Sequence, residues 1–124
     1  MIAALFLAAA MQSAVADPIE DACYDRNQAQ QAMNICAGQA FERADKELNR
    51  HWREITDHFS DDKEARRLLL DAQRAWLRYR DAQCELDAFQ SRGGSMWPML
   101  VAGCRASLTR QRNVELANLL GQGE

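Results

Sequence analysis

The chain has 124 residues, enough for one domain. It carries 15 Lys and Arg residues against 18 Asp and Glu residues, and its formal net charge of -3 argues against nucleic-acid binding, which normally uses a basic face. The same mild acidity favours a basic protein partner through long-range attraction.

The N-terminal segment has the pattern of a secretory signal. Residues 1–16 carry no charged side chain, residues 2–10 are all apolar, and the small residues Ala14 and Ala16 stand where signal peptidase would cleave. We therefore predict a signal peptide at residues 1–16 and a single helical domain at residues 17–124. No later stretch is apolar over a length that spans a bilayer, and Cys23 lies too far beyond Ala16 to carry a lipid anchor.

The predicted mature chain contains four cysteines, Cys23, Cys36, Cys84 and Cys104. An even number in a short exported chain indicates disulfides, and hence a periplasmic or secreted protein. No two of them form a C-x-x-C pair, which argues against a metal site. We recognise no Ser/His/Asp arrangement and no phosphate loop, so we expect neither an enzyme nor a bound cofactor.

Apolar residues at steps of three and four predict three long helices. The first begins at the capping pair Asn27 and Gln30, and the second at the capping pair Asp61 and Glu64. The third begins near Ser95 and ends at Gly121. The predicted core stripes are Met33, Ala37, Phe41, Ala44, Leu48, Trp52, Ile55 and Phe59 on the first helix, Ala65, Leu68, Leu69, Ala72, Trp76, Tyr79, Leu86 and Phe89 on the second, and Leu100, Cys104, Leu108, Val114 and Leu119 on the third.

A short turn near residue 60 makes the first two helices antiparallel neighbours. The predicted fold is therefore all-α, a disulfide-bonded three-helix domain built on a long antiparallel helical hairpin. That hairpin register places Cys36 opposite Cys84, which favours a Cys36–Cys84 bridge together with Cys23–Cys104. The sequential pairing of Cys23 with Cys36 and Cys84 with Cys104 remains open.

Several segments carry a family resemblance: MNIC at 33–36, DKELN at 45–49, AQRAWLRYRDAQC at 72–84 and GGS at 93–95, followed by Cys104, Thr109, Arg112 and Leu116. With these the chain resembles the LprI-type family, the lysozyme inhibitor LprI-like N-terminal domain. The resemblance implies a small secreted or surface helical protein with paired cysteines that binds a protein partner. The most concrete function that it implies is the inhibition of lysozyme. The alternative is a structural or stress-related envelope protein without lysozyme activity that could bind metal.

The loop of Arg92, Gly93, Gly94 and Ser95 is the candidate partner-binding site. It offers a cation for catalytic carboxylates, flexible glycines and a hydroxyl, although the same residues also serve as a helix C-cap followed by an N-cap. Trp97 falls off the predicted stripe beside this loop, so we expect it to be exposed and to anchor an interface.

Other polar and aromatic residues have structural interpretations. Trp76 and Tyr79 are predicted to pack in the core because both lie on the second stripe. Asp45, Asn49, Arg80 and Arg112 are predicted to form a polar network with a half-buried pair of Asp45 and Arg80. His51 and His58 share a polar stripe with Glu47 and Glu54 and are weak candidates for zinc or copper ligands, since such stripes are usually solvated. The sequence identifies neither the partner nor the oligomeric state.

Overall fold

The computed structural model describes residues 15–122, so the predicted signal peptide lies almost wholly outside the described residues. Within them the chain forms four α-helices: α1 (Pro18–Arg26), α2 (Gln30–His58), α3 (Lys63–Asp87) and α4 (Trp97–Gln122), with a short 3-10 helix, η2 (Phe89–Ser91), after α3. The all-α class is confirmed, and α1 adds a short helix to the three that were predicted. Between residues 15 and 122 no helix is both long and apolar enough to span a membrane.

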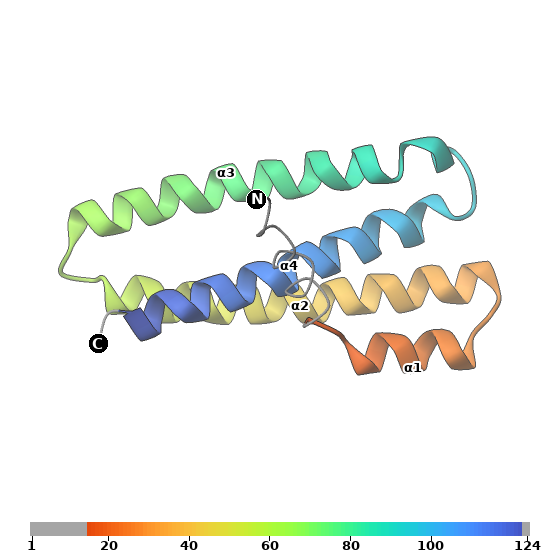
Figure 1. Cartoon of the computed structure of the whole chain (residues 1–124), viewed down its shortest axis with the longest axis horizontal. Coiled ribbons are helices and arrows are strands. Elements are labelled where there is room, and N and C mark those ends of the chain that lie inside the picture. The colour runs from red at the N-terminus through yellow and green to blue at the C-terminus, as the bar shows by residue number, and fades with distance from the viewer. Residues whose placement is uncertain (1–14, 123–124) are drawn as a thin grey trace, which may run out of the picture.

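The most extensive helix contact joins α2 and α4, which run side by side (Figure 1). Small side chains line this contact, since Ala37, Ala40 and Ala44 of α2 and Ala106 of α4 are all buried. Small residues allow two helix axes to approach closely. Asn113 of α4 also donates a hydrogen bond from Nδ2 to the carbonyl oxygen of Ala44 at 3.1 Å. The α2–α4 pair is therefore the centre of the fold.

The large apolar side chains gather toward the turn between α2 and α3. Three helices contribute to this cluster, whose buried members are Leu48, Ile55, Leu69 and Leu116, with Trp52, Phe59, Trp76, Leu119 and Leu120 packed against them. The predicted stripe of the first helix is confirmed at Ala37, Ala44, Leu48 and Ile55, which are all buried.

The predicted stripe of the second helix is wrong at five positions, of which the exposed Ala72 is the smallest. Leu68, Tyr79, Leu86 and Phe89 are 54%, 54%, 68% and 62% exposed. The buried face of α3 instead carries Leu69, Gln73, Arg80 and Cys84. The reason is that α3 packs mainly against α4 and turns toward it a face rotated away from the predicted stripe. The stripe of the third helix is displaced as well, because Val101 and Leu116 are buried while Val114 is 48% exposed.

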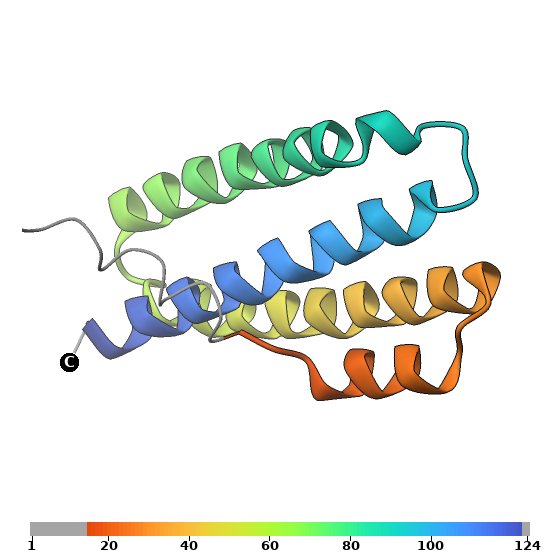
Figure 2. The same cartoon turned by 45° about the vertical axis from the view of Figure 1, so that its right-hand side comes forward.

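The favoured disulfide pairing is also wrong. The structure pairs Cys23 with Cys36 and Cys84 with Cys104, with Cα–Cα distances of 5.8 and 5.5 Å. The hairpin register assumed that α2 and α3 pack directly against each other along their length. Figures 1 and 2 show instead that α4 runs beside α2 and that α3 lies beyond it, at one edge of the molecule. Cys84 therefore meets α4, and not α2.

The helix ends differ slightly from the predicted caps. Asp62, and not Asp61, caps α3 by accepting a hydrogen bond from the Ala65 backbone N–H at 3.0 Å. Asn27 ends α1 and does not begin α2, whose N-cap is Ala29. The Asn27 side chain donates from Nδ2 to the Cys23 carbonyl oxygen at 2.8 Å, as expected of a residue that closes a helix end.

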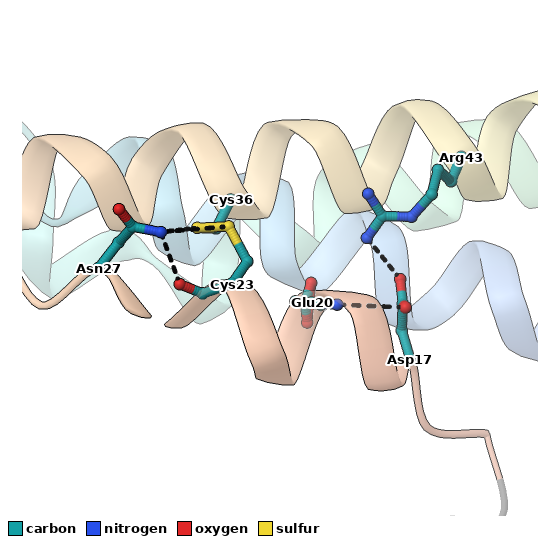
Figure 3. Close-up of a disulfide and its surroundings, with 6 residues drawn as sticks. All are labelled: Asp17, Glu20, Cys23, Asn27, Cys36 and Arg43. Atoms are coloured by element: carbon teal, nitrogen blue, oxygen red, sulfur yellow. Dashed lines mark hydrogen bonds and ion pairs between the residues drawn. A yellow bond between two sulfur atoms is a disulfide. The ribbon is translucent and has the colours of Figure 1, made fainter. Parts of the chain in front are cut away.

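Two attachments hold α1 against α2 (Figure 3). One is the Cys23–Cys36 disulfide, and the other is an ion pair of 2.9 Å between Arg43 and Asp17, which also caps α1. Burial alone would raise the pKa of Asp17, but hydrogen bonds from Arg43 and from the backbone of Glu20 outweigh it and hold that pKa below its ordinary value. No residue of α1 is fully buried, so these attachments position the helix.

We predict that the two disulfides contribute unequally to stability. Replacing Cys84 and Cys104 together by Ala should lower the free energy of unfolding by about 2–4 kcal/mol, because this bridge restricts the unfolded chain and joins two core helices. Replacing Cys23 and Cys36 together should cost less and should expose α1 to proteases. Urea unfolding followed by circular dichroism, with limited proteolysis, measures both effects. Equal losses of stability in the two variants would mean that α1 is part of the cooperative core.

Candidate functional site

Residues 92–96 form a tip loop that connects η2 to α4 at one end of the molecule (Figure 2). Gly93 has a φ of +81°, in the left-handed region that glycine adopts without strain. The Gly94 N–H donates to the Ser91 carbonyl oxygen at 2.9 Å, and Asn34 of α2 donates from Nδ2 to the Ser95 carbonyl oxygen at 3.0 Å. The loop is thus held in shape both by its own turn and by α2.

A hollow of about 240 Å³ lies beside the tip loop. Arg92, Gly93, Gly94 and Ser95 are all exposed. Trp97 was predicted to be exposed, but it is only partly accessible, because it opens α4 and its side chain lines the hollow next to α3. Arg92 and Trp97 therefore share one surface with residues of α3 and η2. The lining residues are Ala82, Glu85, Leu86, Phe89, Arg92 and Trp97.

Sequence reasoning missed Leu86 and Phe89 as surface residues because it assigned them to the core. A signal was nevertheless present in the sequence. The second helix carries two apolar series, one containing Leu69 and Trp76 and the other containing Tyr79 and Leu86, and these occupy different faces. A helix at the edge of a small domain can bury only one of them.

Only part of the predicted polar network is present, and it is centred on Arg80. Its side chain is buried, and its guanidinium lies 5.1 Å from the ring centre of Phe41 on α2 and 5.3 Å from that of Trp76. Arg80 donates from Nε to Asp81 at 3.0 Å and from Nη1 to Thr109 of α4 at 3.4 Å. Arg80 therefore pairs with Asp81 and not with Asp45, and it contacts all three long helices.

Arg112 joins this network through Trp76 and Gln73. Its guanidinium lies 5.8 Å from the Trp76 ring centre, and its Nε donates to Gln73 at 3.0 Å. Gln73 in turn lines a groove of about 370 Å³ together with Asp45 and Asn49. Arg80 and Arg112 are thus joined through Trp76 and Gln73, two residues that the prediction did not assign to the network, whereas Asp45 and Asn49 only line the adjoining groove.

A second groove, of about 480 Å³, lies between α1 and α4 and was not predicted. Its walls include the apolar residues Met33, Met99 and Leu100, and its polar end contains Glu20 and Arg110. Oε2 of Glu20 and Nη1 of Arg110 are buried without a hydrogen-bond partner. Burial raises the pKa of Glu20 and the charge of Arg110 opposes that rise, with a net increase. Glu20 is therefore a partly buried carboxylate whose charged form is disfavoured by its surroundings.

Comparison with known proteins identifies the family of this chain. The family described as Lysozyme inhibitor LprI matches residues 22–116, which include the end of α1, all of α2 and α3, the tip loop and most of α4. The chain belongs to the LprI family. A protein of Rhizobium meliloti (strain 1021) described as uncharacterized is 47% identical over 106 residues, covering 77% of this chain and 76% of the relative. No solved structure matches the chain.

In this member of the LprI family, the two weak candidate metal ligands, His51 and His58, do not lie in a common cluster. His51 Nε2 lies 3.9 Å from Glu47, while the His58 ring packs edge-on against Phe59 with a centroid distance of 4.8 Å. Between residues 15 and 122 no three His, Cys, Asp or Glu side chains come together in a way that could hold a metal ion.

We predict that Arg80→Ala destabilises the LprI domain by about 2–4 kcal/mol, because it removes a buried cation that contacts three helices and leaves a cavity. Arg66→Ala is the matched control, since Arg66 is exposed on the same helix and its loss should change stability by less than about 0.5 kcal/mol. Urea unfolding of both variants provides the measurement. A similar midpoint for the two would argue against a central role for Arg80.

We predict that Glu20→Gln stabilises the protein at neutral pH. The raised pKa of Glu20 means that its protonated form stabilises the fold, and that this contribution is lost as the pH rises through the folded-state pKa. The gain of the Gln variant should therefore disappear below about pH 4, where the wild-type carboxyl is protonated in both states. Thermal unfolding from pH 3 to 8 tests this, with Asp21→Asn on the exposed side of α1 as the control. A gain that does not vary with pH would disprove the electrostatic explanation.

Proposed function

We propose that this chain is an exported protein-binding module that inhibits lysozyme, and that the tip loop enters the cleft of the enzyme. The observation that carries the proposal is the match of residues 22–116 to the family described as Lysozyme inhibitor LprI. That match covers both disulfides and the whole tip loop.

The cysteine chemistry supports export. All four cysteines are paired, and structural bridges of this kind are typical of an oxidising compartment such as the periplasm or the extracellular space. The uncharged segment at residues 1–16 would supply the export signal.

The shape and charge of the tip loop support the mode of binding. Arg92 is exposed at the end of the molecule and forms no ion pair with any residue between 15 and 122. Lysozyme cleaves its substrate with two carboxyl groups in a cleft, and an arginine fork binds carboxylates through two parallel hydrogen bonds. A loop held in shape by its own turn and by Asn34 loses little conformational entropy on binding. The net charge of -3 would also attract a basic lysozyme.

We expect the oxidised protein, residues 17–124, to inhibit an animal-type lysozyme at physiological salt, and we expect reduction of the disulfides to abolish the effect. Inhibition by Arg92→Glu should be weaker by roughly tenfold or more, because the carboxylates of the cleft would then face a third negative charge. Arg53→Glu is the matched control, since Arg53 is exposed near the opposite end of α2.

Lysozyme turnover measured against inhibitor concentration distinguishes the outcomes. Equal inhibition by both charge-reversal variants would remove the tip loop from the proposal. An absence of inhibition and of binding by the wild-type protein would reject the inhibitor function for this lysozyme type and favour the alternative of a structural envelope protein.

A further inference from the structure

The outer face of α3 and η2 carries an exposed apolar stripe. Its members follow one another at alternating steps of three and four residues, which average the seven-residue repeat of a coiled-coil seam. All of them are exposed, and the four large ones have more than half of their surface accessible. Five of its seven members were predicted from the sequence to lie in the core. The stripe consists of Leu68, Ala72, Ala75, Tyr79, Ala82, Leu86 and Phe89.

The sizes of these side chains suit an antiparallel copy of the same helix. In this register the two helices are centred on the level of residues 80 and 81, where the two-fold axis passes. Tyr79 then faces Ala82 of the second copy, Ala75 faces Leu86, and Ala72 faces Phe89. Each of these three pairs holds one large and one small side chain, which is how close-packed cores avoid both voids and clashes, and Leu68 lies beyond the paired part of the stripe. A parallel pairing would instead set Tyr79 against Tyr79 and Ala75 against Ala75.

The charges beside the stripe suit the same arrangement. Asp71, Arg78, Glu85 and Arg92 stand seven residues apart along one edge of the stripe, and their signs alternate. In the antiparallel register Arg78 lies near Glu85 of the second copy, and Asp71 lies near Arg92. Every pair is opposite in charge and occurs twice because of the two-fold axis. Among residues 15–122, Arg78, Glu85 and Arg92 form no ion pair within the chain.

The hollow beside the tip loop shows that the end of the apolar stripe nearest this loop continues without a gap from α3 to η2. Ala82 and Leu86 of α3 and Phe89 of η2 line it together, with the charged residues Glu85 and Arg92 at the same opening. In the antiparallel register this hollow receives the part of the second copy around Ala72 and Ala75. Figures 1 and 2 place α3 at the edge of the molecule, where a second copy can reach it.

We infer that the protein self-associates through this face, as a two-fold dimer in which two α3 helices pack antiparallel. The interface is isologous, so it closes on itself and does not lead to fibres. Arg92 belongs both to this interface and to the tip loop, so dimer formation and the binding of a tip-loop partner are expected to compete. The dimer does not depend on the proposed lysozyme inhibition.

Sedimentation equilibrium tests the dimer, using the oxidised chain from Asp17 onward, which contains all four helices and both disulfides. The wild-type protein should show a concentration-dependent monomer–dimer equilibrium. Arg78→Glu alone and Glu85→Arg alone should each weaken the dimer by roughly tenfold, because each creates two like-charged pairs. The double variant with both changes should restore the affinity, because it restores every opposite-charge pair.

Arg66→Glu is the matched control, since Arg66 is exposed on α3 but lines a cavity with α2 residues away from the stripe. Leu86→Gln should give a monomer without loss of the fold, because Leu86 is 68% exposed in the single chain. Wild-type protein that stays monomeric at all accessible concentrations would overturn the inference. A dimer that tolerates both single charge reversals, or that the double variant fails to restore, would overturn it as well. None of these results depends on lysozyme, so a failed dimer and a failed inhibitor remain distinguishable.

Discussion

The close packing of α4 against α2 determines most of the other features of this structure. Alanines on α2 and Ala106 on α4 allow the two helices to meet along a long seam. Once α4 occupies that position, α3 must pack against α4 and cannot run the length of α2. The sequential disulfides, the exposed outer face of α3 and the protruding tip loop all follow from this one arrangement.

Arg80 links the three long helices in the part of the molecule that lies beyond the large apolar cluster. The large apolar cluster lies toward the α2–α3 turn, and Arg80 lies further along α3, between Phe41 and Trp76 and in contact with Thr109. A planar guanidinium can stack on two aromatic rings and still donate hydrogen bonds at its edges. One residue thereby provides both apolar and polar contacts, which a lysine could not do in the same way.

Periodicity in the sequence was sufficient to predict three long helices, the turn near residue 60 and the buried stripe of α2, because α2 packs along a single face against its main neighbour. It was not sufficient for α3, where two apolar series compete and only tertiary contact decides which one is buried. The disulfide pairing failed for the same reason, since it assumed the neighbour of α3. The short helix α1 escaped prediction because it buries no residue and is held by a disulfide and an ion pair.

The candidate site was predictable in part. The loop around Gly93 and Gly94 was identified from its composition, and the positive φ of Gly93 gives a backbone reason for a glycine there. The partial burial of Trp97 was not predictable, because it depends on how the start of α4 lies against the end of α3. The groove between α1 and α4 could not be predicted either, because it depends on the position of α1, a helix that was not predicted from the sequence.

The pairing of neighbouring cysteines has a consequence for how the chain matures. Each bridge joins cysteines that follow one another in the sequence, at separations of 13 and 20 residues. A chain that emerges N-terminus first presents Cys23 and Cys36 to an oxidant before Cys84 has appeared, so the first bridge that can form is already the native one. The second pair then finds no competing thiol. Oxidation in this order therefore needs an oxidant but no reshuffling of mispaired bridges, a step that is slow without an isomerase.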